Sequence, residues 1–298
     1  VTVEVLLAAR DDRSRWTIDV QNDSAAWSIM DVEFPRISGI SALGRPKLAV
    51  PRSNWGILYP AVTEQSGSYP SANWPMEFVS LHEIESGLYL GYEDPDACPK
   101  FFNFRAGDHF LYRTPAPEGT RAGNDYRSPG PFALGVCGPD WWQAAKMYRT
   151  WALKQPWTSE GPLTTRESTP DFCKNLGIWF VGGGTEEQVT ENLRRAADFF
   201  GVPVGLHWYS WHRWPFDTHY PDYFPAIPDF RAAIEQVVPE GKVIMPYING
   251  RIVDKDVDAF ARWLPWTAKG VDGKPYNEVY GNGVNQAPMC PATEVWQT

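Results

Sequence analysis

The sequence of 298 residues contains little cysteine, and none of it is arranged in closely spaced pairs. No Cys-x-x-Cys motif occurs, and the four cysteines are far apart: Cys98, Cys137, Cys173 and Cys290. Disulfide-dense scaffolds and zinc knuckles both depend on closely spaced cysteines. The sequence therefore excludes both classes, and its cysteines do not indicate a cellular compartment.

Clusters of basic residues and long apolar runs are also missing. The formal net charge is −9, and no group of Lys and Arg is longer than a pair. Proteins that bind nucleic acid usually carry a basic patch, and a membrane-spanning helix needs about 20 apolar residues in succession. We therefore expect a soluble chain with neither nucleic acid nor membrane as a partner. The compartment stays open, with secretion or a periplasmic location among the alternatives.

Neither end of the sequence has the features of a natural terminus. The chain begins at Val1 without an initiating methionine or the apolar stretch of a signal peptide. It closes with "PATEVWQT", a pattern typical of the beginning of a helix. We therefore expect the sequence to be a fragment of a longer protein.

Residues 1–138 have the pattern of antiparallel strands. Apolar and polar residues alternate in "VTVEVLLAA" and in the two runs of "RWTIDVQNDSAAWSIMDVEF", which are joined at Asn22-Asp23-Ser24. The stretch "HEIESGLYLGYED" repeats this form around Ser86-Gly87. Such alternation interrupted by turn residues is typical of hairpins. The sequence predicts an antiparallel β-sandwich over residues 1–138.

Residues 139–170 are expected to link two domains. The stretch "DWWQAAKMYRTWALKQPW" has the pattern of an amphipathic helix that Asp140 caps and Pro156 ends. Its apolar residues fall on one stripe. The polar segment "TSEGPLTTRESTP" that follows is typical of a linker.

Residues 171–298 alternate between buried strands and helices. The predicted strands are "NLGIWFVGG", "PVGLHWYSW" and "KVIMPYING". The first predicted helix begins at the capping box of Thr185 and Gln188, and the second is "DFRAAIEQVVPEG", which Asp229 caps. The third is "DVDAFARWL" over residues 256–264. Three strand–helix units in series favour a (β/α) barrel.

A doubly wound parallel sheet is the competing fold for residues 171–298. It is disfavoured because the sequence has no GxGxxG turn, and "VGGGT" lacks the Lys-Ser/Thr of a phosphate loop. A (β/α)8 barrel takes about 250 residues, so three units form only the first half of a TIM-type barrel. The open strand edge would be covered by a missing C-terminal half or by another chain.

Aromatic residues and histidines are concentrated around the end of the second predicted strand. Residues 202–225 contain three Trp, three Tyr, two Phe and three His. Sugars are bound by aromatic rings together with polar groups, and barrels bind ligands at the C-terminal ends of their strands. We select His207, Trp208, Trp211 and His212 as candidate sugar-binding residues, although alternation along the strand separates Trp208 from His207. The alternative is that these rings only fill a core.

The third predicted strand is followed by further polar candidates. They are Tyr247, Asn249, Arg251 and Asp254, and Trp179 of the first strand is expected to form the floor of the same site. An Arg251–Asp254 pair that clamps the loop is the structural alternative.

A metal site and a catalytic pair are not predicted. The spacing of His207, His212 and His219 fits no helix face, so neither a metal nor another cofactor is expected. Glycoside hydrolysis normally needs two carboxylates, and none of those after the second and third strands is singled out by its position. The catalytic residues are therefore unknown at this point.

The order of these segments resembles a bacterial glycoside-hydrolase-like family. The resemblance rests on "DWWQAAKMYRTWALKQPW", "NLGIWFVGG", "GLHWYSWHRWPFDTHYPDYFP", "KVIMPYING" and "APMCPATEVWQ". That family carries a domain of unknown function and is related to endo-α-N-acetylgalactosaminidases and α-galactosidase-type barrels.

The resemblance implies a galactose-mutarotase-like sandwich ahead of the barrel and a retaining hydrolase acting on α-galactoside or N-acetylgalactosaminide-type glycans. In related barrels the nucleophilic Asp ends the fourth strand, which implies that nucleophile and acid lie beyond the C-terminus of this chain. This chain alone is then expected to be inactive. A non-catalytic carbohydrate-binding protein and a structural module are the alternatives.

Overall fold

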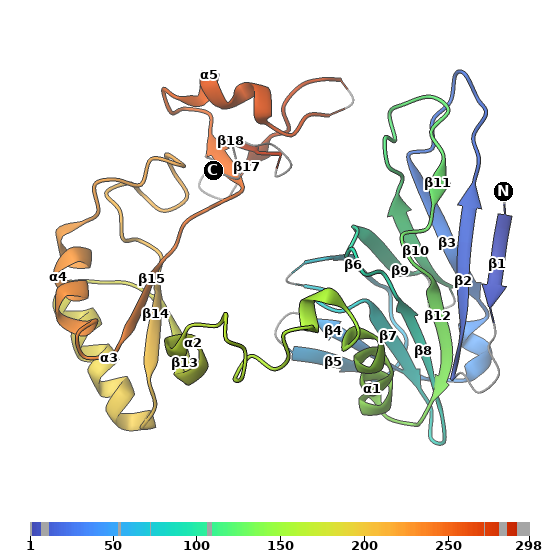
Figure 1. The fold of residues 1–298 in the computed structure, drawn as a ribbon, viewed down its shortest axis with the longest axis horizontal. Helices are drawn as coiled ribbons and strands as arrows, with labels where there is room; N and C mark the ends of the chain where they lie inside the picture. The colour runs from blue at the N-terminus through green and yellow to red at the C-terminus, as the bar shows by residue number, and fades with distance from the viewer. Residues whose placement is uncertain are drawn as a thin grey trace. The chain divides into compact units, whose positions relative to one another are not determined.

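The computed structural model describes residues 2–6, 12–52, 55–71, 73–105, 109–270, 272–279 and 285–290. The chain divides into two compact units, Val1–Gly161 and Pro162–Thr298. The regular structure of the first unit is mainly strand, and the second unit combines strands with helices (Figure 1).

The first unit contains two antiparallel sheets. The larger sheet has the order β1-β2-β12-β8-β7-β4-β5, with β11 paired to β2, and the smaller has the order β3-β10-β9-β6. The strands are β1 (Thr2–Leu6), β2 (Arg13–Val20), β3 (Asp31–Ser38), β4 (Lys47–Arg52), β5 (Trp55–Tyr59), β6 (Gln65–Tyr69), β7 (Phe78–His82), β8 (Gly87–Tyr92), β9 (Lys100–Arg105), β10 (His109–Pro115), β11 (Tyr126–Arg127) and β12 (Phe132–Cys137). A short 3-10 helix, η1 (Ile40–Leu43), precedes β4.

The core of this unit lies between the two sheets. Strands β9 and β10 contribute the buried rings of Phe102, Phe104, Phe110 and Tyr112, which pack with apolar residues of the larger sheet such as Leu90. Successive side chains of a strand point to opposite faces, so the residues between these four face outward.

One predicted hairpin is wrong. Strands β2 and β3, on either side of Asn22-Asp23-Ser24, belong to different sheets. The segment between these strands is bonded to Asn124 at Ile29. The Asn124 side chain accepts from the amide of Ile29 (2.7 Å) and donates to its carbonyl (2.9 Å). The hairpin of β7 and β8 does form, with His82 opposite Gly87.

Helix α1 (Trp141–Ala152) packs on the larger sheet of the first unit. The Asp140 side chain caps it by accepting from the amide of Gln143 (3.1 Å). Its buried residues Ala144, Met147 and Tyr148 pack with Phe78. A 3-10 turn, η2 (Pro156–Thr158), follows, and residues 159–170 contain neither helix nor strand.

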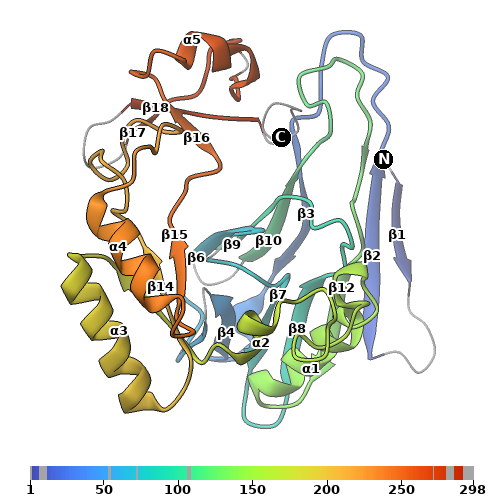
Figure 2. The ribbon, with the colours of Figure 1, turned by 60° about the vertical axis from the view of Figure 1, so that its left-hand side comes forward.

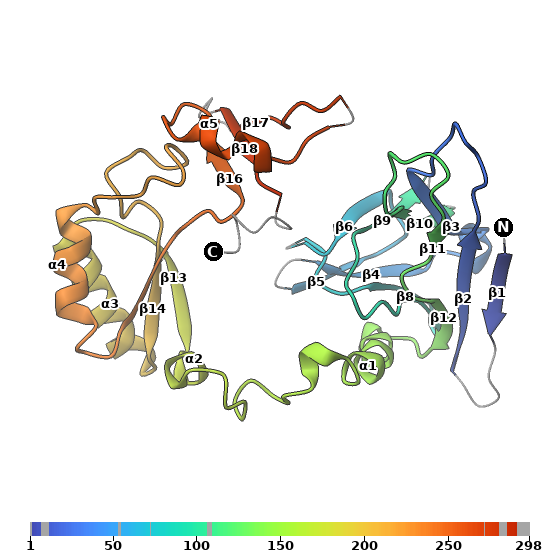
Figure 3. The same ribbon diagram turned by 45° about the horizontal axis from the view of Figure 1, so that its top comes forward.

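The second unit is built around three parallel strands. After the short helix α2 (Asp171–Asn175) come β13 (Ile178–Gly182), α3 (Glu186–Phe200), β14 (Val204–Trp208), α4 (Pro228–Val237) and β15 (Val243–Pro246). The sheet order is β13-β14-β15, and α3 and α4 cover one face of it (Figures 2 and 3). Ile178, Phe180, Leu206 and Ile244 point toward these helices.

The chain after β15 differs from the prediction. The helix expected over residues 256–264 is limited to α5 (Phe260–Trp263), followed by the 3-10 turn η3 (Leu264–Trp266). Asp254 accepts from the amide of Asp256 (2.9 Å), and this local bond favours a turn at the point where the helix was expected to begin. An antiparallel sheet of order β16-β18-β17 lies beside α5, with β16 (Ile252–Asp254), β17 (Glu278–Val279) and β18 (Asn285–Pro288).

Among the described residues, no helix combines the length and the apolar character that crossing a bilayer requires.

Candidate carbohydrate site

The face of the parallel sheet opposite α3 and α4 carries the first part of the site. Trp179 of β13 stands beside Gly205 of β14 in the parallel register. A Cβ atom on Gly205 would lie 2.6 Å from the Trp179 ring, so only glycine allows the indole to lie across this strand. Trp179 is 42% exposed, so part of its ring is accessible to solvent.

Four rings gather where β14 and β15 end. Tyr209 and Tyr247 stack with centroids 4.6 Å apart and planes 11° apart. His207 lies 4.8 Å from the ring of Tyr209 and 5.8 Å from that of Tyr247, and Phe216 is 5.2 Å from Tyr209. We call His207, Tyr209, Phe216 and Tyr247 the strand-end cluster. Its members are partly exposed, so an aromatic surface faces solvent at the ends of two parallel strands.

Asn249 organises the turn after β15, and its side chain is bonded mainly within the protein. Its Oδ1 accepts from the amides of Arg251 (2.9 Å) and Ile252 (3.2 Å), and its Nδ2 donates to the Tyr247 hydroxyl (3.3 Å). The Tyr223 hydroxyl accepts from the Asn249 amide (2.6 Å). Asn249 thus connects to the strand-end cluster by holding Tyr247.

Arg251 and Asp254 do not form the loop clamp considered as an alternative. The Arg251 guanidinium pairs with both oxygens of Glu278, with 2.7 Å between Nη2 and Oε2. Asp254 is 2% exposed and accepts from the backbone amides of His219 (2.7 Å) and Asp256 (2.9 Å). A carboxylate buried and bonded in this way holds two loops together, so the predicted contact of Asp254 with sugar does not fit the structure.

Trp208 and Trp211 are core residues. Trp208 is fully buried and packs edge-on against Phe230 of α4, 5.1 Å between centroids. Trp211 stacks on Tyr223 (5.7 Å), and its Nε1 donates to the carbonyl of Tyr247 (2.7 Å). Their predicted sugar contacts do not fit this packing, because side-chain alternation directs Trp208 toward the helices.

His212 is also buried, with 3% of its surface exposed. Burial is the main cause that lowers the pKa of its imidazole, and the nearby His219 adds to the effect. Within the described ranges neither ring nitrogen has a hydrogen-bond partner. The same ranges contain no group of three His, Cys, Asp or Glu side chains that would hold a metal ion.

Tyr209 and Phe216 are the residues of the cluster that sequence analysis did not select. Tyr209 follows His207 by two positions, and side-chain alternation is a signal that could have found it. Phe216 comes from the irregular loop after β14, and nothing in the local sequence distinguishes it from the buried rings nearby.

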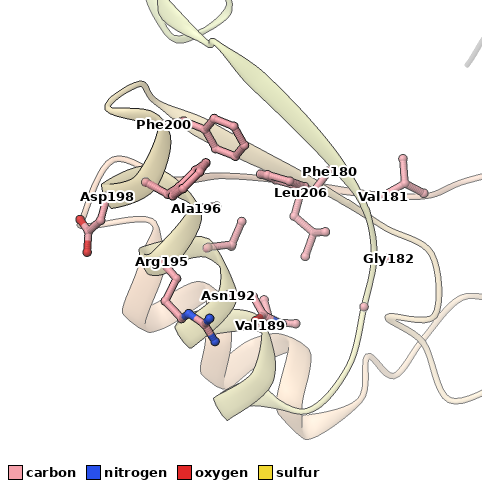
Figure 4. A pocket seen from close by; sticks show the side chains of 13 residues that line it. Phe180, Val181, Gly182, Val189, Asn192, Arg195, Ala196, Asp198, Phe200 and Leu206 are labelled. Carbon is pink, nitrogen blue, oxygen red and sulfur yellow. The ribbon is translucent and has the colours of Figure 1, made fainter.

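A groove lies on the opposite side of the sheet, between the edge strand β13 and α3. It measures about 850 Å³, and its apolar lining includes Phe180, Leu206 and Phe200, whereas Val181 points away from the helix (Figure 4). Strand β13 pairs only with β14 within the described ranges. This flank of the parallel sheet therefore combines an unpaired edge with an apolar groove.

The comparison with protein families identifies the second half of the chain. Residues 126–298 match the family described as "Domain of unknown function (DUF6259)". The chain belongs to this family. The resemblance inferred from the sequence is thereby confirmed.

Two relatives of this DUF6259 chain are named "Putative glycoside hydrolase" and "Putative glycoside hydrolase 22789". One, from Bacteroides thetaiotaomicron, is 28% identical over 100% of this chain and 45% of its own length. The other, from Monosiga brevicollis, is 31% identical over 83% of this chain and 24% of its own length. The chain thus spans less than half the length of either relative.

Solved glycoside hydrolases share the fold. An α-N-acetylgalactosaminidase from Bifidobacterium bifidum aligns with 97% of this chain and 56% of its own, with a TM-score of 0.72 and 14% identity. An α-galactosidase from Thermus thermophilus aligns with 99% of this chain and 59% of its own, with a TM-score of 0.55 and 12% identity. At such identities the likeness concerns the fold alone.

Proposed function

We propose that this chain is the carbohydrate-binding N-terminal part of a retaining glycoside hydrolase acting on α-galactoside or N-acetylgalactosaminide-type glycans. The observation that carries the proposal is the strand-end cluster, in which Tyr209 stacks on Tyr247 at the C-terminal ends of parallel strands. Barrels bind their ligands at this end, and aromatic rings match the apolar C–H face of a sugar. The substrate class is suggested by the names of the solved structures that share the fold.

The three parallel strands are, in this proposal, the first part of a (β/α)8 barrel. Three features support it: the order β13-β14-β15, the position of α3 and α4 on one face, and the position of Trp179 and His207 on the other. The unpaired edge of β13 and the groove beside α3 would then receive a further strand–helix unit of the longer protein.

The catalytic acid and nucleophile lie, we propose, on later strands of that barrel. Near the cluster, the Asp217 side chain accepts from the Tyr220 hydroxyl (2.8 Å), Asp254 accepts from two backbone amides, and Glu278 pairs with Arg251. Glycosidases hold two carboxyl groups about 5 to 9.5 Å apart across the scissile bond. These bonds support a structural role for these three carboxylates.

The binding site is tested by titrating the chain with N-acetylgalactosamine and with galactose and following saturation-transfer NMR. We expect Tyr209→Ala and Tyr247→Ala each to weaken binding about tenfold, because the stacked platform is lost. Tyr276→Ala, which removes a tyrosine that is 57% exposed elsewhere in this unit, is the matched control. Unchanged binding by both cluster variants, with native circular dichroism, would refute the site.

The enzymatic part is tested by assaying this chain and a full-length homologue on aryl α- and β-galactosides and N-acetylgalactosaminides. We expect turnover by the homologue only, because loss of one member of a catalytic pair removes most of the rate. Equal turnover by the two proteins would direct the search back to Asp217, Asp222, Asp254 and Glu278. Binding without hydrolysis by the homologue would favour a non-catalytic carbohydrate-binding protein.

A further inference from the structure

The outer face of the smaller sheet in the first unit has an unusual distribution of side chains. Because Phe102, Phe104, Phe110 and Tyr112 point into the core, alternation turns the residues between them outward. The antiparallel registers then place two rows across this face: Ser66–Asn103–Leu111 and Ser68–Phe101–Arg113. The face thus carries one aromatic ring beside small and polar groups, together with Leu111, which is 3% exposed.

A trough runs along this face. It measures about 380 Å³ and is lined by residues of both rows, among them Ser66, Ser68, Phe101 and Asn103. Strand β6 is at the edge of the sheet, and its two outward serines are small, so nothing bulky from this strand covers the Phe101 ring on that side. On the other side the Arg113 guanidinium lies 4.7 Å from the ring centroid. Phe101 is 39% exposed, so part of its ring stays accessible.

The polar groups of the trough suit a neutral ligand rich in hydroxyls. The hydroxyls of Ser66 and Ser68 can both donate and accept hydrogen bonds. Arg113 lies opposite Glu33 in the register and 3.6 Å from a carboxylate oxygen of Asp31. Because the guanidinium is flanked by carboxylates, the trough has no excess of positive charge for a phosphate or sulfate.

We propose that this trough binds a pyranose sugar, as a second carbohydrate site separate from the strand-end cluster. The C–H face of the sugar packs against Phe101, and its hydroxyls bond to the hydroxyls of Ser66 and Ser68. The volume falls in the range of small-molecule sites, about 300 to 1,000 Å³. All these residues belong to the first unit, so the proposal does not depend on the function proposed for the second.

The test uses the whole chain with N-acetylgalactosamine and galactose as probes, monitored by saturation-transfer NMR. To remove binding at the other site, the variants are made in a Tyr247→Ala background. We expect saturable binding in this background and about tenfold weaker binding after Phe101→Ala, because the aromatic contact is lost. Ser68→Val should also weaken it, since valine fills the trough and suits a strand.

Phe199→Ala is the matched control, because it removes an exposed phenylalanine of α3 that lies outside both sites. Binding in the Tyr247→Ala background that survives both Phe101→Ala and Ser68→Val would overturn the proposal, as would the absence of any binding in that background. In this design, binding at the trough is measured without binding at the strand-end cluster. Loss of binding through Phe101→Ala alone, with Tyr247→Ala silent, would support the trough and contradict the strand-end cluster.

Discussion

At the scale of residues, polar side chains of this protein divide into those used internally and those left facing solvent. Asn249 and Asp254 follow a strand just as ligand-binding residues would, yet both are bonded to backbone amides. Tyr209 and Phe216 are hydrophobic by type but present their rings at the surface of the strand-end cluster. Exposure and hydrogen bonding therefore distinguish the candidate ligand contacts better than residue type does.

Three buried ionisable side chains lie together in the first unit and make the stability of that unit depend on pH. Glu77, Asp94 and Lys100 are at most 1% exposed, with 3.6 Å between the Lys100 Nζ and Glu77 Oε1 atoms. Burial raises the pKa of Glu77 to about 7, although Lys100 opposes this effect. In the native state the Glu77 carboxyl therefore keeps its proton up to a higher pH. In the unfolded state the same carboxyl releases it near the ordinary pKa of 4.5.

We predict that the first unit loses stability as the pH rises from about 4.5 to about 7, by up to about 3 kcal/mol. Urea denaturation at pH 5 and pH 8 measures this difference. Glu77→Gln keeps the side chain neutral and should flatten the profile, whereas Glu85→Gln at an exposed position should leave it unchanged. A profile of equal slope in wild type and Glu77→Gln would show that another group titrates.

At the scale of elements, the caps explain where the helices begin, and one of them connects two helices. Thr185 and Gln188 form the predicted capping box of α3. Asp229 was expected to cap its own helix, α4, but its carboxylate accepts from the amide of Glu186 at the start of α3 (3.0 Å). A carboxylate at this position also interacts favourably with the dipole of α3.

We predict that Asp229→Ala destabilises the second unit by about 1 kcal/mol, because the α3 amide loses its acceptor. The change is measured as a shift in the urea midpoint, together with faster hydrogen exchange at Glu186. Asp229→Asn is the matched control, since it keeps an oxygen acceptor and should recover much of the loss. Destabilisation by Asp229→Ala without faster exchange at Glu186 would contradict the cap.

At the scale of the whole molecule, the two units have separate cores. The first core lies between two antiparallel sheets, and the second lies between three parallel strands and two helices. The stretch 159–170 between α1 and α2 contains turns but neither helix nor strand.

We predict that limited proteolysis cleaves first within residues 159–170, because a protease needs an extended segment that regular structure does not hold. Mass spectrometry of early fragments locates the cut. Helix α1 serves as the internal reference, since its buried face is packed on the sheet of the first unit. Cleavage within Trp141–Ala152 at an equal rate would contradict the separation into these units.

The sequence by itself determined the local features of this protein: the alternation of the strands, the capping box at Thr185, the cap of α1 at Asp140 and the family. These features follow from residues close together in the sequence, because side-chain periodicity and helix caps are properties of a single helix or strand. Only the tertiary structure decided that β2 and β3 belong to different sheets, that Asp254 accepts from the amide of His219, and that Asp229 caps α3. Each of these depends on contacts between residues distant along the chain, and a local pattern does not specify which distant partner a side chain will meet.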